Sequence, residues 1–293
     1  MIQHYRFGHP IHTGAVLDKP TMDITPVMDF PGWDISPSNG SLSKTLSESM
    51  RVFGLGETVR GMNKRGWIYI SNNTDDPNHD EDKRSLYASQ NFILLASPEE
   101  EEVEGIFVDD PGTVRFDIGY TELNRLIICS ESGNADIYRF TADSADEIVR
   151  QFRAITGQSY IPPKWAFGFG QSRWGYKSEE DIRAVFTRYR DASVPLDSIY
   201  LDIDYMERYK DFTVNTESFP HFPDFVEEMR KSHVHLVPII DAGVKMEEGY
   251  ETYEEGCEKD YFVKKENGER LVAAVWPGRV HFPDFFKPEV QHW

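Results

Sequence analysis

Cysteine is nearly absent from this sequence. Only Cys129 and Cys257 occur among 293 residues, and they lie far apart along the chain. A disulfide framework is therefore excluded, and a metal site built from thiolates is disfavoured. The N-terminal stretch "MIQHYRFGHPIHTG" has no apolar signal segment, and no run approaches the ~18 apolar residues of a membrane helix. These absences predict a cytoplasmic protein without a membrane span.

Basic residues are also few relative to acidic ones. Lys and Arg number 31 against 50 Asp and Glu, which gives a formal net charge of -19. Such a surface repels nucleic-acid phosphates and anionic lipids, so we expect neither nucleic acid nor a membrane as a partner. A neutral ligand fits better. The aromatic content of 13% suits a sugar, because aromatic faces stack on sugar rings.

Short β-rich runs recur between residues 51 and 141. The runs are RVFGLGE, GWIYISN, NFILLAS, EGIFVDD, TVRFDIG, RLIICS and ADIYRFT. Turn residues separate them, and this spacing predicts an antiparallel β-sandwich. Residues 1–50 are expected to be irregular with a few short strands, so the first domain should cover residues 1–142. The acidic run 98–105 is expected to form a solvated hairpin tip.

A helical pattern follows the last of these runs. Residues 143–157 predict an amphipathic helix that Asp143 or Ser144 caps and Gly157 ends. We expect residues 143–161 to connect the sandwich to a second domain.

Strands and helices alternate in the second domain, residues 162–293. The expected strands are 165–171, 196–204 and 234–242, and the expected helices are 178–192, 222–232 and 247–260. The alternation predicts a parallel α/β fold with strands buried on both faces. A (β/α)8 TIM barrel needs roughly 250 residues, so we expect only its first part here, truncated, and a longer parent protein.

Carboxylates and tryptophans occur where these strands, or nearby loops, should end. The candidate residues are Asp75, Trp174, Asp202, Asp204, Asp241 and Trp276. Burying an ionised carboxylate without a partner costs several kcal/mol, and the C-terminal ends of barrel strands form the active-site face. Trp faces and carboxylates are the groups that hold a pyranose ring and its hydroxyls. The alternatives are core packing for each Trp and a structural ion pair for Asp204.

Two other motifs do not indicate a functional site. "GFGQSRWGY" has Arg173 where a dinucleotide-binding loop needs its third glycine, so we exclude that function. His233 and His235 have no third ligand nearby in the sequence, and we interpret them as surface histidines rather than metal ligands.

Four longer segments resemble the early barrel of the glycoside hydrolase family 31 α-glucosidases. They are "IPPKWAFGFGQSRWGY", "LDIDYMERYKDFTVNTESFPHFP", "LVPIIDAGV" and "VWPGRVHFPDF". In addition, "YISNNTDDP" and "SLYASQNFIL" resemble the loop of the family's N-terminal β-sandwich that reaches into the active site. The resemblance covers roughly residues 50–293 and implies a β-sandwich followed by the start of a TIM barrel.

The resemblance also implies a set of substrate-binding residues. They are Asp75, Trp174, Asp202, Ile203, Ile239, Asp241 and Trp276. Asp202 would bind hydroxyls on the far side of the non-reducing glucose, with Ile203 packing beside it, and Asp75 would come from the sandwich loop. Trp174, Ile239 and Trp276 would line the pocket, and Asp241 would support the third strand end. Asp204 would pair with a cation such as Arg173 or Arg208. No metal or cofactor is implied.

The implied activity is retaining hydrolysis of a non-reducing terminal α-glucose of oligosaccharides. An α-xylosidase or transglucosidase of the same family and a non-catalytic sugar-binding module remain alternatives, and homo-oligomer formation by the full-length protein is left open. In the family, the aspartate nucleophile lies in a W-x-D-M-N-E segment beyond the position that matches Trp276, and the acid/base aspartate lies further on. Neither is present in residues 1–293, so no catalytic residue is named.

We therefore predict that the 293-residue chain alone does not hydrolyse p-nitrophenyl α-glucoside. Retaining hydrolysis needs two carboxyl groups about 5–5.5 Å apart across the scissile bond. The measurement is release of p-nitrophenol by the purified chain. Turnover that copurifies with the chain would show that the nucleophile is assigned to the wrong segment.

Overall fold

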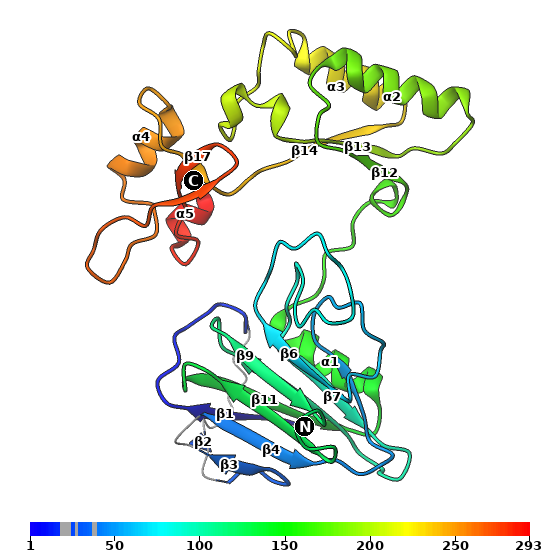
Figure 1. The fold of residues 1–293 in the computed structure, drawn as a ribbon, viewed down its shortest axis with the longest axis vertical. Helices are drawn as coiled ribbons and strands as arrows, with labels where there is room; N and C mark the ends of the chain where they lie inside the picture. The colour runs from blue at the N-terminus through cyan, green and yellow to red at the C-terminus, as the bar shows by residue number, and fades with distance from the viewer. Residues whose placement is uncertain (18–24, 27–28, 37–39) are drawn as a thin grey trace. The chain divides into compact units, whose positions relative to one another are not determined.

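The chain forms two compact units, Met1–Ser159 and Tyr160–Trp293, each described here by itself. The computed structural model describes residues 1–17, 25–26, 29–36 and 40–293 (Figure 1). The boundary between the units falls inside the predicted connecting segment 143–161.

The first unit is an antiparallel β-sandwich, as the strand spacing predicted. Its strands are β1 (Ile2–Phe7), β2 (Thr25–Pro26), β3 (Asp34–Ser36), β4 (Ser41–Thr45), β5 (Arg51–Gly54), β6 (Trp67–Ser71), β7 (Phe92–Ala96), β8 (Val103–Asp109), β9 (Val114–Ile118), β10 (Arg125–Ser130) and β11 (Ala135–Ala142). One sheet has the order β2-β1-β11-β8-β7-β5 and the other the order β3-β4-β10-β9-β6. Every run predicted between residues 51 and 141 forms a strand. All pairs are antiparallel except β1 with β2.

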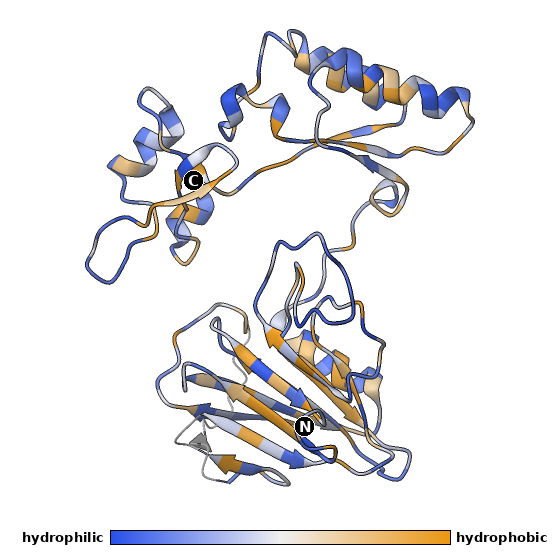
Figure 2. Cartoon of the chain, in the orientation of Figure 1, coloured by the Kyte–Doolittle hydropathy of each residue, from blue (hydrophilic) through white to orange (hydrophobic). Residues whose placement is uncertain are grey.

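The alternation of apolar side chains in these strands builds the core between the two sheets. In β9, for example, Val114, Phe116 and Ile118 are buried, whereas Arg115 between them is exposed. The period of two places one side of each strand inside, and the core cluster takes residues from strands of both sheets. Figure 2 shows apolar residues along the strands of both sheets.

Helix α1 (Ala145–Thr156) covers the outer face of the six-stranded sheet. The Ser144 side chain accepts a hydrogen bond from the Glu147 N–H, and Gly157 ends the helix at a φ of 96°, as predicted. Ile148 is buried against β8, where a Cβ on Gly105 would lie 2.6 Å from the Ile148 side chain. Glycine at this position therefore permits the close approach of helix and sheet.

The acidic run between β7 and β8 forms the tip of a hairpin, but its last part is not solvated. Residues 98–102 are exposed as expected, whereas Glu104 is buried. The indole N–H of Trp33 donates to Glu104 over 3.0 Å, and the ammonium group of Lys44 lies 3.1 Å from its carboxylate. The position of Glu104 in β8 brings its carboxylate next to Trp33 and Lys44. No local sequence pattern indicates this pairing.

The second unit begins with a parallel three-stranded sheet of order β12-β13-β14. The elements of this part are η2 (Lys164–Phe167), β12 (Gly170–Ser172), α2 (Glu179–Asp191), β13 (Ser198–Leu201), η3 (Ile203–Tyr205), η4 (Glu207–Tyr209), α3 (Phe222–Lys231) and β14 (His235–Pro238). The predicted parallel strand–helix alternation is confirmed. Helices α2 and α3 pack on one face of the sheet, where Ile182, Phe225 and Met229 meet Ile199 and Leu201.

The predicted strand 165–171 is wrong over most of its length. Residues Lys164–Phe167 form a 3-10 turn, and only Gly170–Ser172 is a strand. The Asp197 carboxylate accepts the backbone N–H of Phe169 over 3.0 Å, so this segment bonds to a side chain rather than to a strand ladder.

The prediction that the parallel strands are buried on both faces is also wrong within the described residues. Tyr200 of β13 is 43% exposed, while its neighbours Ile199 and Leu201 are fully buried. The reason is that α2 and α3 cover one face only, and Tyr200 points to the other.

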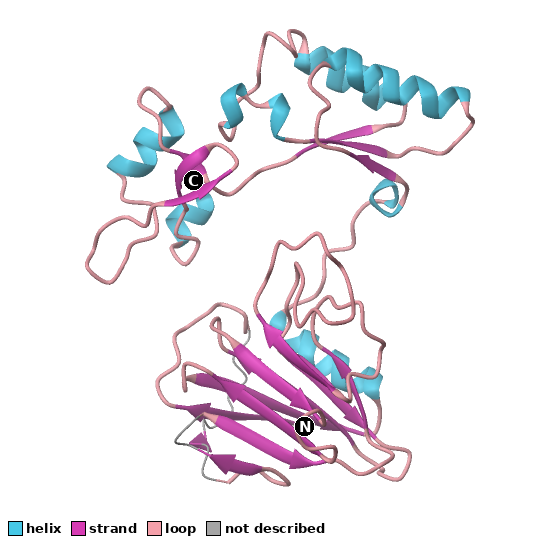
Figure 3. Ribbon diagram, viewed as in Figure 1, coloured by secondary structure: helices cyan, strands magenta, loops and turns pink. Residues whose placement is uncertain are grey.

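The end of the chain adds a small antiparallel sheet that the sequence did not predict. Strands β15 (Val244–Lys245), β17 (Gly278–His281) and β16 (Ala273–Val275) form it in this order, with helices α4 (Glu251–Glu258) and α5 (Pro288–His292). Val244, Tyr250 and Phe262 make its core. The predicted helix 247–260 is therefore shorter and packs here rather than on the parallel sheet (Figure 3).

A buried ion pair in the sandwich generates a stability prediction. Burial alone would raise the pKa of Asp136, but the His4 imidazole, 2.8 Å away, and two hydrogen bonds from Arg6 outweigh it and lower that pKa to about 2. A lowered folded-state pKa contributes stability above the unfolded value near 3.9, and this stability is lost as the pH falls towards 2. We expect Asp136→Asn to lower the free energy of unfolding at pH 7 by about 2 kcal/mol.

Urea unfolding of the chain between pH 2 and pH 7 measures this effect. Asp34→Asn is the matched control, because Asp34 also pairs with an arginine, Arg125, but its side chain is largely exposed. Exposed pairs contribute about 0–1 kcal/mol, so this variant should behave like the wild type. Equal losses in the two variants would contradict the prediction.

Candidate functional site

The register of the parallel sheet brings two predicted site residues together. Leu201 of β13 is paired with Pro238 of β14, and the Ile239 N–H donates to the Leu201 carbonyl oxygen over 2.9 Å. Asp202 follows Leu201 directly, and Asp241 lies three residues past Pro238. Both acids therefore lie at the carboxyl edge of the parallel sheet. In (β/α)8 barrels this edge carries the active site.

The two carboxylates are close enough to influence each other. Burial raises the pKa of Asp241, and the negative charge of Asp202 raises it further. Asp202 caps η3, with its Oδ1 accepting the Ile203 N–H over 2.7 Å. Asp241 Oδ2 is buried and has no hydrogen-bond partner among the described residues. Asp202, which is only partly buried, therefore has acceptor capacity left for a ligand that carries hydroxyl groups.

The apolar members of the candidate set differ in exposure. Trp174 is 66% exposed in the loop after β12, and Trp276 is 73% exposed in the turn between β16 and β17. Neither ring belongs to the apolar core of this unit as described, and the role of each tryptophan in binding remains a prediction. Ile239 is partly exposed after β14, whereas Ile203 is only 6% exposed within η3.

The ion pair expected for Asp204 is wrong. The Arg208 guanidinium bonds instead to Glu247, which also binds Lys210 and Lys245. Asp204 Oδ2 is buried and lacks a hydrogen-bond partner in the described part of the chain. The sequence could not foresee this, because Glu247 lies far along the chain and reaches η4 only through the fold.

Sequence reasoning missed Asp211, which follows η4. Asp211 is 2% exposed, and burial raises the pKa of its carboxyl group to about 7. The hydroxyl of Tyr250 donates to its carbonyl oxygen over 2.7 Å. The only local signal is an acid between Lys210 and Phe212 shortly after the strand end, which is too weak to single it out.

Asp75 lies in the first unit, exposed in the loop after β6. The Thr74 N–H donates to the Leu86 carbonyl oxygen over 2.8 Å, and the Ser89 N–H donates to Asn73 over 2.9 Å. A hydrogen bond with Asp75 raises the pKa of the Tyr87 hydroxyl. The two segments quoted for this loop are thus paired with each other, and the role of Asp75 remains a prediction.

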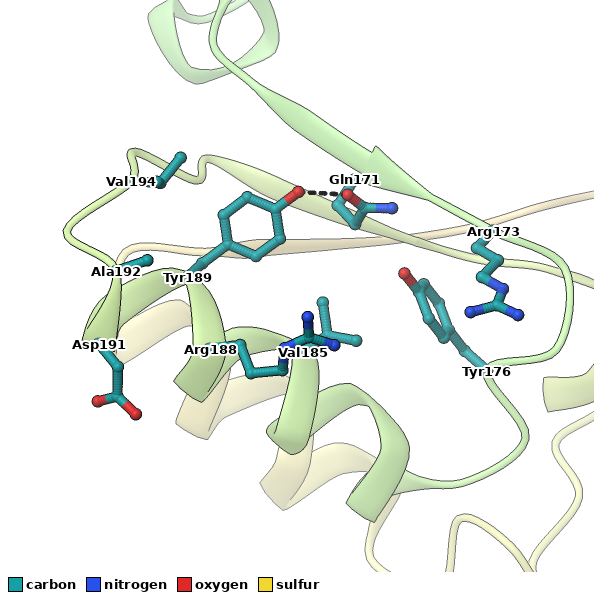
Figure 4. A pocket seen from close by; sticks show the side chains of 9 residues that line it. All are labelled: Gln171, Arg173, Tyr176, Val185, Arg188, Tyr189, Asp191, Ala192 and Val194. Atoms are coloured by element: carbon teal, nitrogen blue, oxygen red, sulfur yellow. Dashed lines mark hydrogen bonds between the residues drawn. The ribbon is translucent and has the colours of Figure 1, made fainter.

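A cavity of about 710 Å³ lies beside β12 and α2 rather than at the acids (Figure 4). Its lining residues are Gln171, Arg173, Tyr176, Val185, Arg188, Tyr189, Asp191, Ala192 and Val194. The Tyr189 hydroxyl is hydrogen-bonded to the Gln171 side chain across it. None of the predicted binding residues lines this cavity, so its size alone does not mark the functional site.

His233 and His235 lie at the start of β14, His233 in the turn before it and His235 as its first residue. His235 stacks on Trp165 with ring centroids 4.0 Å apart, and His233 is exposed in a turn. Across the described ranges of the chain, no three His, Cys, Asp or Glu side chains are placed to hold a metal ion together.

None of the helices in the described ranges has both the length and the apolar composition needed to cross a bilayer.

Two family descriptions match the chain in the order of its units. The "Glycosyl hydrolase 31 N-terminal galactose mutarotase-like domain" matches residues 15–117, and the "Glycosyl hydrolases family 31 TIM-barrel domain" matches residues 159–293. The similarity predicted from the sequence motifs is confirmed for both parts.

Curated relatives and solved structures agree with these matches. "Alpha-glucosidase 2" of Bacillus thermoamyloliquefaciens is 33% identical over 85% of the chain, and the "Lysosomal alpha-glucosidase" of Mus musculus is 32% identical over 85%. A Flavobacterium johnsoniae dextranase solved with glucose is 26% identical, with a TM-score of 0.79 over 90% of this chain. The chain spans 32%, 26% and 32% of the lengths of these three proteins.

Proposed function

Since the chain belongs to glycoside hydrolase family 31, we propose that it forms the N-terminal part of a retaining α-glucosidase. The substrate would be an oligosaccharide with a non-reducing terminal α-glucose, held without a metal or cofactor. The observation that carries the proposal is the pair Asp202 and Asp241 at the ends of two adjacent parallel strands. The curated α-glucosidases among its relatives support the same reaction class. The low cysteine content supports a cytoplasmic location.

The proposed sugar contacts follow from the chemistry of each side chain. Asp202 has one carboxylate oxygen occupied by the Ile203 N–H, which leaves lone pairs for the glucose hydroxyls. The exposed rings of Trp174 and Trp276 provide stacking faces, and the partly exposed Ile239 provides an apolar wall. We include Asp75 among the proposed sugar-binding residues because its segment resembles the sandwich loop of the family.

Asp202 is the residue on which the proposal depends most. Its removal takes away charge-assisted hydrogen bonds that are each worth roughly 1.5–3 kcal/mol. We expect Asp202→Ala in the full-length protein to lower kcat/KM for p-nitrophenyl α-glucoside by at least about tenfold, with little loss of stability. Steady-state kinetics and the melting temperature of the same preparation measure the two effects.

Asp197→Ala is the matched control for this variant. Asp197 lies at the other end of the same strand, where it holds the Phe169 N–H. Its loss should lower the melting temperature and leave kcat/KM of the folded protein unchanged. Full activity of Asp202→Ala would show that the acid at the strand end is architectural.

The residue beside Asp202 should set the sugar specificity. In this family, α-xylosidases tend to carry a bulky aromatic side chain next to the sugar C6 group, where this chain has Ile203. We therefore expect the full-length protein to hydrolyse p-nitrophenyl α-glucoside faster than p-nitrophenyl α-xyloside. Ile203→Phe should shift the ratio of the two kcat/KM values towards the xyloside by about tenfold or more.

The ratio is the appropriate measurement, because Ile203 is nearly buried and a larger side chain also lowers the folded fraction. A lower folded fraction reduces both kcat/KM values by the same factor, so their ratio does not change. Ile203→Leu, which keeps the side-chain volume, should retain the glucoside preference. Equal or better turnover of the xyloside by the wild type would refute glucose specificity.

A further inference from the structure

The outer face of the six-stranded sheet carries a group of polar side chains. Arg6, Asp136 and Asp109 are paired in one row across β1, β11 and β8. His4 and Tyr138 form a second pair, two residues away along the same strands. The core between the two sheets takes the alternate residues of these strands, so the five polar side chains share the opposite face, on which α1 packs.

The segment that follows β1 lies over this face. The Thr13 hydroxyl donates to Oδ1 of Asp109 over 2.7 Å. Val16 is buried in the apolar cluster under α1, and the Leu17 N–H donates to the carbonyl oxygen of Ile155 in that helix over 2.8 Å. The segment is therefore held both to the sheet and to the helix. A cavity of about 230 Å³ lies between the segment and the strands.

Asp136 has its partners within the protein. Nε and Nη2 of Arg6 donate to its two oxygens, each over 2.7 Å, and Nε2 of His4 lies 2.8 Å from Oδ1. The His4 ring in turn stacks on Tyr138, with the ring centroids 4.5 Å apart. Asp136 therefore fixes Arg6 at the wall of the cavity and has little acceptor capacity left for a ligand.

Three other polar groups at this cavity remain open. Tyr138 is 2% exposed and lines the cavity, and its hydroxyl has no hydrogen-bond partner among the described residues. In the same part of the chain, Nη1 of Arg6 has no acceptor and Oδ2 of Asp109 has no donor. Because buried hydroxyl groups are usually hydrogen-bonded, these converging groups indicate a ligand that supplies the partners.

The open groups favour a neutral ligand with several hydroxyl groups. A tyrosine hydroxyl donates and accepts, a guanidinium donates and a carboxylate accepts, and sugar hydroxyls match all three. An anion is disfavoured, because Asp109 and Asp136 both line the cavity and the charge of Arg6 is already paired. A metal ion is disfavoured too, since the described residues place no three His, Cys, Asp or Glu side chains together.

The size and the walls of the cavity limit the ligand further. Pockets for drug-sized molecules measure about 300–1,000 Å³, so a cavity of about 230 Å³ suits a smaller molecule such as a single sugar ring. Pro10, Ile11 and Val16 form apolar parts of the wall. Apolar walls with a few convergent polar groups are typical of small-molecule sites.

We propose that this cavity in the sandwich is a binding site for a monosaccharide. The Tyr138 hydroxyl, Nη1 of Arg6 and Oδ2 of Asp109 bind the sugar hydroxyls, and Ile11 and Val16 contact the C–H groups of the ring. The site goes beyond the proposed function and does not depend on it, because every contributing residue belongs to the first unit.

Methyl NMR of the 293-residue chain, titrated with D-glucose and D-galactose, tests this site. The methyl groups of Ile11 and Val16 report on the sandwich cavity, whereas those of Ile203 and Ile239 report on the edge of the parallel sheet. We expect saturable shifts of the Ile11 and Val16 signals with at least one sugar, with a Kd on the order of millimolar.

Two substitutions test the proposed contacts. Tyr138→Phe removes the hydroxyl but keeps the ring on His4, and it should raise the Kd by about fivefold. Asp109→Asn keeps an acceptor for Thr13 but removes the charge, and it should raise the Kd by about tenfold. Because the Tyr138 hydroxyl has no partner among the described residues, Tyr138→Phe should not lower the melting temperature without sugar.

Tyr69→Phe is the matched control. Tyr69 is also 2% exposed, but it belongs to β6 in the other sheet and does not line the cavity. The same substitution there should leave the Kd measured at Ile11 and Val16 unchanged. Equal weakening of sugar binding in Tyr69→Phe and Tyr138→Phe would overturn the proposal.

The remaining outcomes separate this site from the proposed function. Absence of shifts at Ile11 and Val16 with either sugar up to about 100 mM would overturn the sandwich site, and so would shifts there with inorganic phosphate instead of sugar. Shifts confined to Ile203 and Ile239 would support the proposed function and overturn this inference. Shifts at Ile11 and Val16 that persist in Asp202→Ala support the sandwich site whether or not that variant keeps its activity.

Discussion

Parallel pairing of β13 with β14 is the constraint on which the candidate site depends. Parallel strands end at the same edge, so the residues that follow them meet however far apart they lie in the sequence. Leu201 opposite Pro238 sets this register, and the hydrogen bond from Ile239 extends it past the last paired residue. Asp202 and Asp241 are neighbours for this reason, and after burial the charge of Asp202 is the second cause that raises the pKa of Asp241.

The acids of this chain show how strongly the surroundings control protonation. Bonds from Lys245 and Arg208 lower the pKa of Glu247 to about 2, whereas burial without a cation raises the pKa of Asp211 to about 7. Lys210 links the two segments, because it directly precedes Asp211 in the chain and its ammonium group pairs with Glu247. Glu247 is a charged residue that forms an ion pair with Arg208 of η4. Asp211 is suited to form hydrogen bonds as a neutral group.

The connections beyond the strands carry as much of the site as the strands themselves. The loop after β13 binds the end of β14 through the Tyr205 hydroxyl, and Trp276 lies in the turn between β16 and β17 of the small sheet. Such contacts would suit the proposed recognition of a sugar ring, because side chains that are already positioned lose little freedom on binding. The cavity beside α2 lacks such convergent acids despite its volume.

Local patterns in the sequence were enough to predict the sandwich strands after residue 50, the capped helix α1 and the alternation of parallel strands with helices. These features depend on side-chain period and on caps such as Ser144, which act over a few residues. The strand ends bearing Asp202 and Asp241 were predictable for the same reason. Motif resemblance added Ile203, Ile239 and the family.

Tertiary structure alone decided which charges meet. Glu104 is buried with Trp33 and Lys44, Arg208 binds Glu247 rather than Asp204, and the Tyr250 hydroxyl donates to the Asp211 carbonyl oxygen. Each of these contacts joins residues from separate elements, so no local pattern encodes it. Their energies depend on burial and on the distance between charges, and both quantities exist only once the chain has folded.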